Sequence, residues 1–128
     1  MSFMVINAAQ YLGRTFDNGH CVRFVQMTGN VPHTSTWRRG AKVRGTALGR
    51  GTVIATFGGT PPRYENRTDG SSHVAVLEGE EDVGLAVIDC WVGQPVARRI
   101  IRFRDGSGSA VNDGDQFYVV ETTEPNTV

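Results

Sequence analysis

The sequence predicts an α+β fold in one domain that covers residues 1–128. Apolar residues at helical spacing are confined to the first quarter of the chain, and five apolar runs typical of strands follow in the second half. Turns rich in glycine, aspartate and serine separate these runs, as expected for an antiparallel sheet. A chain of 128 residues is long enough for a single hydrophobic core, and no repeat or linker divides it.

Two short helices are expected near the start of the chain. Residues 2 to 12 carry apolar side chains three to four positions apart, which predicts the first helix. The second helix has an apolar side formed by Cys21, Phe24, Val25 and Thr28. Gly29 and Asn30 end this helix. We expect Asn18 to be its N-cap, which places Cys21 in the first turn, where unpaired backbone N–H groups favour an anion.

The middle of the chain is basic and rich in glycine. Residues 37 to 51 intersperse arginine and lysine with glycine, which predicts a segment of turns with solvated charges. RNA-binding segments show a similar pattern, but Trp37 is the only aromatic residue here that could stack on a base. Thirteen basic and thirteen acidic residues give the chain a formal net charge of zero. We therefore expect neither nucleic acid nor membrane as a partner, and no apolar run is long enough to span a bilayer.

The second half of the chain is expected to form the sheet. The strand-like runs are residues 52–57, 73–77, 85–91, 97–103 and 116–120. The second and third runs form a hairpin whose loop spans residues 79 to 83. Symmetric pairing about Glu81 puts His73 opposite Asp89, on the same face of the sheet. This register is an assumption, because a slip of one residue would turn Asp89 to the other face.

Cys21, His73 and Asp89 together have the chemistry of a cysteine nucleophile. A helix start lowers the pKa of a thiol, and a nearby imidazole holds or takes its proton. A carboxylate beside the imidazole fixes its tautomer and stabilises its charged form. Asp89 lies within an apolar strand, where a charge is costly unless another group pairs with it. The sequence therefore predicts a site composed of Cys21, His73 and Asp89.

Other uses of these residues stay open at the level of the sequence. Taken singly, Cys21 also suits a core position, His73 the start of a strand, and Asp89 a turn or an ion pair. Zinc is a rival use, because His20 adjoins Cys21, but the CxxC, HxH and HExxH spacings are absent. We therefore expect no metal and no cofactor. Cys90 suits a small buried apolar position, although a disulfide with Cys21 is arithmetically allowed.

Three short motifs, in this order, resemble the papain-like amidases of the NlpC kind. They are Asn-Gly-His-Cys-Val at residues 18–22, Ser-His-Val-Ala-Val at 72–76 and Val-Ile-Asp-Cys-Trp at 87–91. More narrowly, the chain resembles, from about Ala8 to Val120, a small bacterial family that includes amidase effectors of type VI secretion. The resemblance implies a papain-like fold in which a helix carrying the nucleophile packs on an antiparallel sheet. It also implies hydrolysis of an amide bond in the peptide stems or cross-links of the bacterial cell wall.

The resemblance also implies a role for each matched residue. Cys21 corresponds to the nucleophile, His73 to the base and Asp89 to the residue that orients it, and the reaction would pass through a thioester. Cys90 departs from the family pattern, in which a polar residue such as glutamine is expected. It should point away from the site because Asp89 points in.

Further residues are expected to complete the site. Asn18 or Tyr64 is the expected second oxyanion donor. Trp37, Tyr64 and Arg63 lie in stretches expected to flank the site and to line a groove for a stem peptide, whose carboxylates an arginine recognises well. Two other functions on the same fold stay open: a non-catalytic module that binds wall peptide or a partner protein, and a papain-like protease or acyltransferase.

The resemblance and the first residues together predict where the protein acts. The chain opens without a basic leader or an apolar stretch of signal-peptide length, so no signal peptide is expected. Synthesis in the cytoplasm and type VI secretion into the periplasm of a target cell follow from the resemblance. The implied partners are peptidoglycan peptide as substrate and a cognate immunity protein. The sequence sets neither the oligomeric state nor the bond that is cut.

Overall fold

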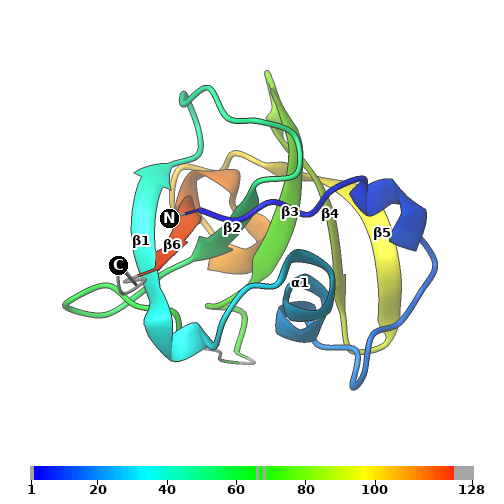
Figure 1. Ribbon diagram of the computed structural model, residues 1–128. Helices are drawn as coiled ribbons and strands as arrows, with labels where there is room; N and C mark the ends of the chain where they lie inside the picture. The colour runs from blue at the N-terminus through cyan, green and yellow to red at the C-terminus, as the bar shows by residue number, and fades with distance from the viewer. Residues whose placement is uncertain (1, 66, 68, 123–128) are drawn as a thin grey trace.

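The computed structural model describes residues 2–65, 67 and 69–122, and within them one α-helix packs on a six-stranded antiparallel sheet (Figure 1). The strands are β1 Trp37–Lys42, β2 Val53–Thr56, β3 Val74–Glu81, β4 Gly84–Trp91, β5 Gln94–Arg102 and β6 Phe117–Thr122. Their order across the sheet is β1-β6-β2-β3-β4-β5, from left to right in Figure 1. The predicted α+β class is confirmed, and each of the five predicted strands is present within a few residues of its expected bounds.

The helix α1, Cys21–Gly29, lies across β3 and β4 (Figure 1). The side chains that it buries are Val22, Phe24 and Val25. The residue that caps it is His20, so the prediction of Asn18 as N-cap is wrong. The side-chain oxygen of Asn18 instead accepts a hydrogen bond from the His20 N–H at 3.0 Å, in the turn before the helix. Cys21 is nevertheless the first helical residue, which leaves its own N–H without a partner inside the helix.

The predicted helix over residues 2 to 12 is wrong. A short 3-10 helix, Ala8–Tyr11, is the helical structure described there. Before it, the chain runs extended against the sheet, where the Val5 N–H donates to the Gly51 carbonyl at 2.8 Å. Asn7 then adopts a left-handed conformation with φ 52°, which interrupts a right-handed helical path. Val5 and Ala8 are buried in this segment, whereas Ile6 is 74% exposed, so the apolar spacing does not mark one buried face.

Residues 37 to 42 form strand β1, a strand that the prediction of a turn-rich segment with solvated charges did not include. This strand lies at one edge of the sheet and pairs with β6 alone, with Trp37 opposite Thr122. Trp37 is its one buried residue. The other residues of the strand, from Arg38 to Lys42, face solvent wholly or in part. The strand therefore lacks the alternation of apolar and polar residues that marks most strands. Charged side chains also keep an edge strand from pairing with another chain.

Two apolar clusters cover opposite faces of the sheet. The cluster under α1 includes Phe24, Val74, Val76 and Ile88. The cluster on the other face includes Ala75, Leu77, Val87 and Phe117. Alternate residues of β3 and β4 divide between the two clusters, as the pleat requires. Because both faces of these strands are covered, their sequences are continuous apolar runs.

The hairpin of β3 and β4 has a different register from the predicted one. Its turn is shorter than expected, because Glu81 pairs with Gly84 across two residues. Further along, Val76 pairs with Ile88, and continuing this register places Ala75 opposite Asp89. The prediction that His73 pairs directly with Asp89 is therefore wrong by two positions. A shift of two keeps both side chains on one face of the sheet, which is why they still meet.

A β-bulge at Glu78 makes this possible. The pairing changes between Leu77 and Gly79, so that one extra residue lies on β3. If the register at the turn continued unbroken, His73 and Asp89 would point to opposite faces of the sheet. The bulge therefore decides whether the imidazole and the carboxylate share a face.

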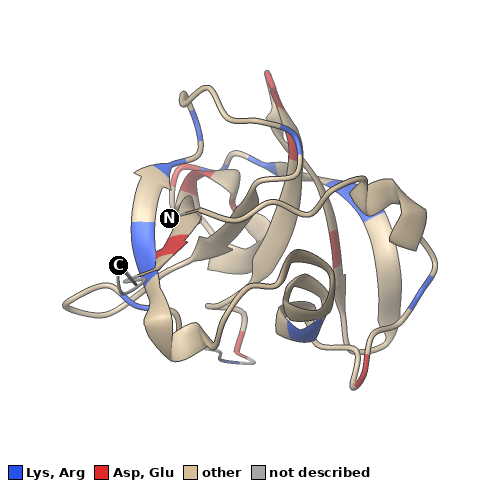
Figure 2. Ribbon diagram, viewed as in Figure 1, with Lys and Arg blue, Asp and Glu red and all other residues tan. Residues whose placement is uncertain are grey.

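Charged residues are interspersed along the ribbon (Figure 2). Several of them pair, such as Arg98 with Glu78 at 3.0 Å and Arg44 with Asp115 at 2.8 Å. Pairs at the surface add little stability, so the two apolar clusters hold the fold together. In the described part of the chain, no helix has the length and apolar character needed to cross a membrane.

Close packing of β4 against β5 predicts that Gly84→Ala destabilises the protein. An added Cβ at Gly84 would contact backbone of β5, with the Arg102 Cα only 2.8 Å away. Overpacking against backbone costs about 1–3 kcal/mol. The matched control is Gly79→Ala, where nothing lies within 4 Å of the added Cβ. Urea denaturation should show a lower free energy of unfolding for Gly84→Ala and an unchanged or slightly higher one for Gly79→Ala. Equal values for the two variants would contradict this account of the packing.

Candidate active site

His73 and Asp89 form a buried pair at one end of the hairpin. The Nε2 of His73 lies 2.7 Å from Oδ2 of Asp89, and the two residues are 5% and 1% exposed. The same carboxylate oxygen accepts a second hydrogen bond from Nε of Arg99 at 2.8 Å. Through Oδ2, Asp89 thus has two partners that offset the cost of a charge inside an apolar strand.

Cys21 reaches this pair from the start of α1. Its Sγ lies 4.0 Å from the Tyr64 hydroxyl. Burial alone would raise the pKa of the thiol. A hydrogen bond with His73, the charge of that imidazole and the Val74 N–H lower the pKa by more than burial raises it, so the net pKa lies below its ordinary value of 9.0. The thiolate is therefore stabilised by the groups around it.

The pKa of His73 moves in the opposite direction. Burial lowers it, but the hydrogen bonds to Asp89 and Cys21 and their negative charges raise it more, to about 9. Because Nε2 is bonded to Asp89, Nδ1 is the ring nitrogen left to interact with the thiol. A lowered thiol pKa beside a raised imidazole pKa favours the thiolate–imidazolium pair over two neutral groups.

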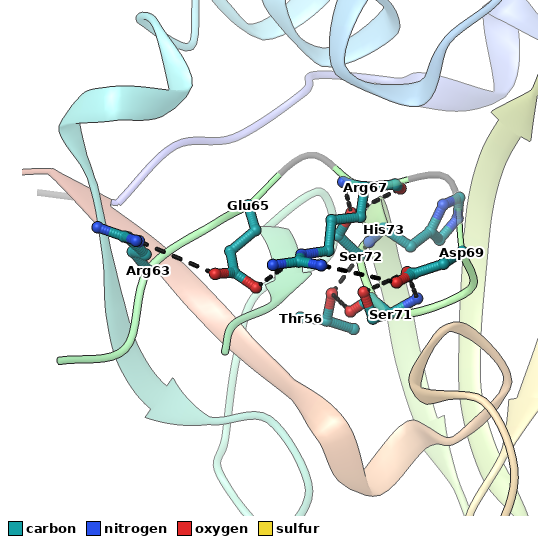
Figure 3. A network of polar contacts seen from close by, with 8 residues as sticks. All are labelled: Thr56, Arg63, Glu65, Arg67, Asp69, Ser71, Ser72 and His73. Atoms are coloured by element: carbon teal, nitrogen blue, oxygen red, sulfur yellow. Dashed lines mark hydrogen bonds and ion pairs between the residues drawn. The ribbon is translucent and has the colours of Figure 1, made fainter. Parts of the chain in front are cut away.

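Thr56 fixes the backbone of His73. Its buried hydroxyl oxygen accepts the His73 N–H at 3.0 Å, and the hydroxyl donates to the Ser71 carbonyl at 3.1 Å (Figure 3). The His73 carbonyl in turn accepts the Thr56 N–H at 3.0 Å. The imidazole therefore projects from a backbone position that is held on both sides.

The loop before His73 carries a network of charges. Figure 3 shows Arg67 between Glu65, at 3.0 Å, and Asp69, at 3.9 Å. The Ser72 hydroxyl donates to the Arg67 carbonyl at 2.8 Å. Arg63 contacts Glu65 at 3.9 Å, and its side chain is 72% exposed. These contacts bring the loop together beside the catalytic candidates.

Cys21 and His73 open into a cavity of about 780 Å³. Other lining residues include Asn18, His20, Arg23, Tyr64, Arg67, Ser72, Trp91, Arg99 and Asn112. A volume of this size suits a small-molecule or peptide ligand. Two of the expected additional site residues, Asn18 and Tyr64, are thus placed at the cavity.

Trp37 and Arg63 do not line the cavity, contrary to the expected groove. Trp37 is fully buried, and its indole N–H donates to the Pro32 carbonyl at 3.0 Å. Its ring centroid lies 4.7 Å from that of Tyr64, so the tryptophan supports the tyrosine from behind. Trp37 is thus a core residue at the start of an edge strand, whereas the sequence indicated an exposed position in a turn.

Arg99 is the residue that sequence reasoning missed. It lies on β5 opposite Val87, on the same face of the sheet as Asp89. A signal was present, because the arginine lies within a predicted strand next to the one that carries the unexplained carboxylate. Without the register of β4 and β5, it could not be told from a solvated charge.

The second cysteine lies outside the cavity lining. Cys90 is buried on the opposite face of β4 from Asp89, in the cluster under α1. Burial, followed by the negative charges of Cys21 and Asp89, raises its pKa to about 12. Both cysteines are free thiols. No three His, Cys, Asp or Glu side chains among the described residues gather closely enough to hold a metal ion.

Comparison with known proteins identifies the family. Residues 2–120 match the family described as domesticated amidase effector 2. The chain belongs to this family. "Domesticated amidase effector 2" of Ixodes scapularis is 33% identical over 110 residues, which cover 82% of this chain and 72% of the relative. The solved structure of "Type 6 secretion amidase effector 2 (Tae2)" superposes with a TM-score of 0.76 at 27% identity, over 98% of each chain. The resemblance to type VI amidase effectors that the sequence indicated is confirmed.

The charge pair predicts fast alkylation of Cys21 below the ordinary thiol pKa. Iodoacetamide should modify Cys21 and spare the buried Cys90, and the rate should reach half its plateau at a pH below 9.0. In His73→Ala the hydrogen bond and the cation are lost while burial remains, so the midpoint should move upward. The rate at pH 7 falls about tenfold for each unit of that shift. Peptide mass spectrometry over a pH series measures both, and an unmoved midpoint would contradict the pairing.

The bonds of Thr56 predict a cost for Thr56→Val. Removing the hydroxyl leaves the His73 N–H without its acceptor, which costs about 1–3 kcal/mol when the group is buried. Thr122→Val is the matched control, because its buried hydroxyl has no hydrogen-bond partner among the described residues. Thermal or urea unfolding should show destabilisation in the first variant and little change in the second. A neutral Thr56→Val would mean that this hydroxyl does not hold His73.

Proposed function

We propose that this protein is a papain-like cysteine amidase that hydrolyses an amide bond in peptidoglycan stem peptides or cross-links, with residues 1–128 as a single catalytic domain. The observation that carries the proposal is a thiol at a helix start that shares a cavity with a buried imidazole, which Asp89 holds at 2.7 Å. The imidazole lowers the pKa of that thiol, which agrees with this geometry. All three components lie at or directly behind one cavity. Cys21 is the nucleophile, His73 the acid and base, and Asp89 the residue that orients His73.

In the first step, the Cys21 thiolate attacks the carbonyl carbon of the scissile amide. A C–S bond forms, and the carbonyl electrons move onto oxygen. The Cys21 N–H, free at the helix start, donates to this oxyanion. Tyr64 is the second donor, because its hydroxyl lies 4.0 Å from Sγ. Burial, and then the nearby Cys21, raise the tyrosine pKa, so it keeps the proton that it donates. Asn18, which also lines the cavity, is the alternative donor.

In the second step, His73 gives its proton to the leaving amine. The C–N bond breaks and a thioester with Cys21 remains. A water molecule then attacks the thioester while His73 takes a proton from it. The C–S bond breaks with its electrons returning to sulfur, the acid product leaves, and the thiolate–imidazolium pair is restored. Because this donor is an imidazolium with a pKa of about 9, hydrolysis declines as the pH rises through that value.

The names of the relatives support the substrate and the route. Both are amidase effectors by name, and the solved relative is named for type 6 secretion. On this basis we assign a peptidoglycan peptide as substrate, type VI delivery into the periplasm of a target cell, and a cognate immunity protein as a partner. A non-catalytic binding module would not need a thiolate, so the charge pair favours an enzyme.

The proposal predicts that Cys21→Ala abolishes release of fragments from isolated peptidoglycan sacculi. Loss of the nucleophile should lower the rate by at least about 10⁴-fold, as for other nucleophile–base sites that act as a unit. Cys90→Ala is the matched control, because that thiol is buried, carries a raised pKa and does not line the cavity. It should cleave at close to the wild-type rate. Mass spectrometry of the soluble fragments identifies the bond that is cut. Cleavage by Cys21→Ala at the wild-type rate would refute the assignment.

A further inference from the structure

The lining of the cavity has an uneven charge. Among the described residues that line it are three arginines, Arg23, Arg67 and Arg99, and none is an aspartate or a glutamate. The chain as a whole carries equal numbers of acids and bases, so this excess is local. A carboxylate-free cavity with several guanidinium groups favours an anionic ligand.

The three arginines differ in how their charges are balanced. Arg23 pairs with Asp17 at 2.9 Å, and the Asp17 side chain is itself 55% exposed. Arg67 pairs with Glu65 and Asp69, so two carboxylates oppose one guanidinium. The carboxylate that pairs with Arg99 is shared with the imidazole of His73. Arg99 is therefore the least fully balanced arginine of the three.

The guanidinium of Arg99 is held in place but is not saturated. Its Nε donates to Asp89, and its Nη2 donates to the Val111 carbonyl at 3.4 Å. Its Cζ atom lies over the Trp91 ring, 5.2 Å from the ring centroid. An arginine has five N–H donors in a fixed fork, and these bonds use two of them. With the side chain 24% exposed, the remaining donors are available to a ligand in the cavity.

The position of Arg99 places such a ligand next to the reacting atoms. Asp89 is 1% exposed and does not line the cavity, whereas Arg99 and His73 both do. An anion that enters therefore meets the guanidinium before the carboxylate behind it. Arg99 and His73 bind the same carboxylate oxygen of Asp89. A group bound by this arginine therefore lies beside the imidazole that acts on the scissile amide.

We propose that Arg99 binds a free carboxylate of the substrate beside the scissile bond, so that the enzyme selects stem peptides whose carboxyl group there is a free acid. This inference rests on the proposed function and adds the substrate class that the site prefers. A planar guanidinium donates two parallel hydrogen bonds to the two oxygens of a carboxylate. A primary carboxamide cannot accept both bonds, because its NH₂ group is itself a donor and would face an N–H of the arginine.

The test uses two synthetic cross-linked stem peptides that differ only in the carboxyl groups flanking the scissile amide. In one peptide these are free acids, and in the other they are primary carboxamides. The wild-type enzyme should show a kcat/KM at least about tenfold higher for the acid, since tenfold corresponds to about 1.4 kcal/mol, which one charge-assisted hydrogen bond supplies. Arg99→Gln should bring the ratio of the two values close to one, chiefly by slowing the acid peptide.

The control is Arg98→Gln on the same strand. That side chain is exposed, pairs with Glu78 at 3.0 Å and does not line the cavity, so the ratio should stay at the wild-type value. Arg99→Lys, which keeps the charge but not the fork, should give an intermediate ratio and serves where Arg99→Gln fails to fold.

Each outcome decides the inference. If Arg99 acts only by positioning Asp89, both peptides slow equally in Arg99→Gln and the ratio is unchanged, which overturns the proposal. Equal kcat/KM values for the two peptides with the wild-type enzyme overturn it without any variant. If the wild-type enzyme cleaves neither peptide, the proposed function itself is overturned. If it cleaves both peptides at the same rate, only the inference about Arg99 is overturned.

Discussion

The site depends on a single buried oxygen atom. Oδ2 of Asp89 accepts hydrogen bonds from both His73 and Arg99, while the other carboxylate oxygen is buried without a hydrogen-bond partner among the described residues. A buried acceptor left unpaired costs about 1–3 kcal/mol, and two charge-assisted bonds to the neighbouring oxygen offset that cost. The carboxylate is thereby fixed in one orientation. The direction of the imidazole, and through it the charge on the Cys21 thiol, follows from that orientation.

The surrounding fold serves to bring these groups into register. The helix start supplies Cys21 from one side of the sheet, and the residue directly before β3 is His73. Thr56, on a third element, fixes the histidine backbone. Trp37 begins an edge strand distant in sequence and packs behind Tyr64, which faces the thiol. Three separate segments, which carry Cys21, His73 and Tyr64, therefore meet at one sulfur atom. Thr56 and Trp37 support two of them from behind.

Much of this arrangement was predictable from the sequence, for physical reasons. The start of α1 at Cys21 follows from a turn before an apolar face, and Asp89 was conspicuous as a charge within an apolar strand. The register of the hairpin was not predictable, because hydrophobicity encodes the face of a residue but not the length of a turn or the presence of a bulge. Trp37 was misplaced because a strand with one buried residue has no periodicity. Arg99 was missed because its role depends on a pairing between strands.

The bulge at Glu78 has a consequence for the evolution of the family. Removing that residue from the chain would join Leu77 directly to Gly79 and leave every observed pair of β3 and β4 intact, from Val76 with Ile88 to Glu81 with Gly84. Loss or gain of one amino acid within the paired stretches of β3 or β4 would instead rotate the imidazole away from its carboxylate. The bulge residue and the two-residue turn between Glu81 and Gly84 are therefore the parts of this hairpin whose length can change without disturbing the site.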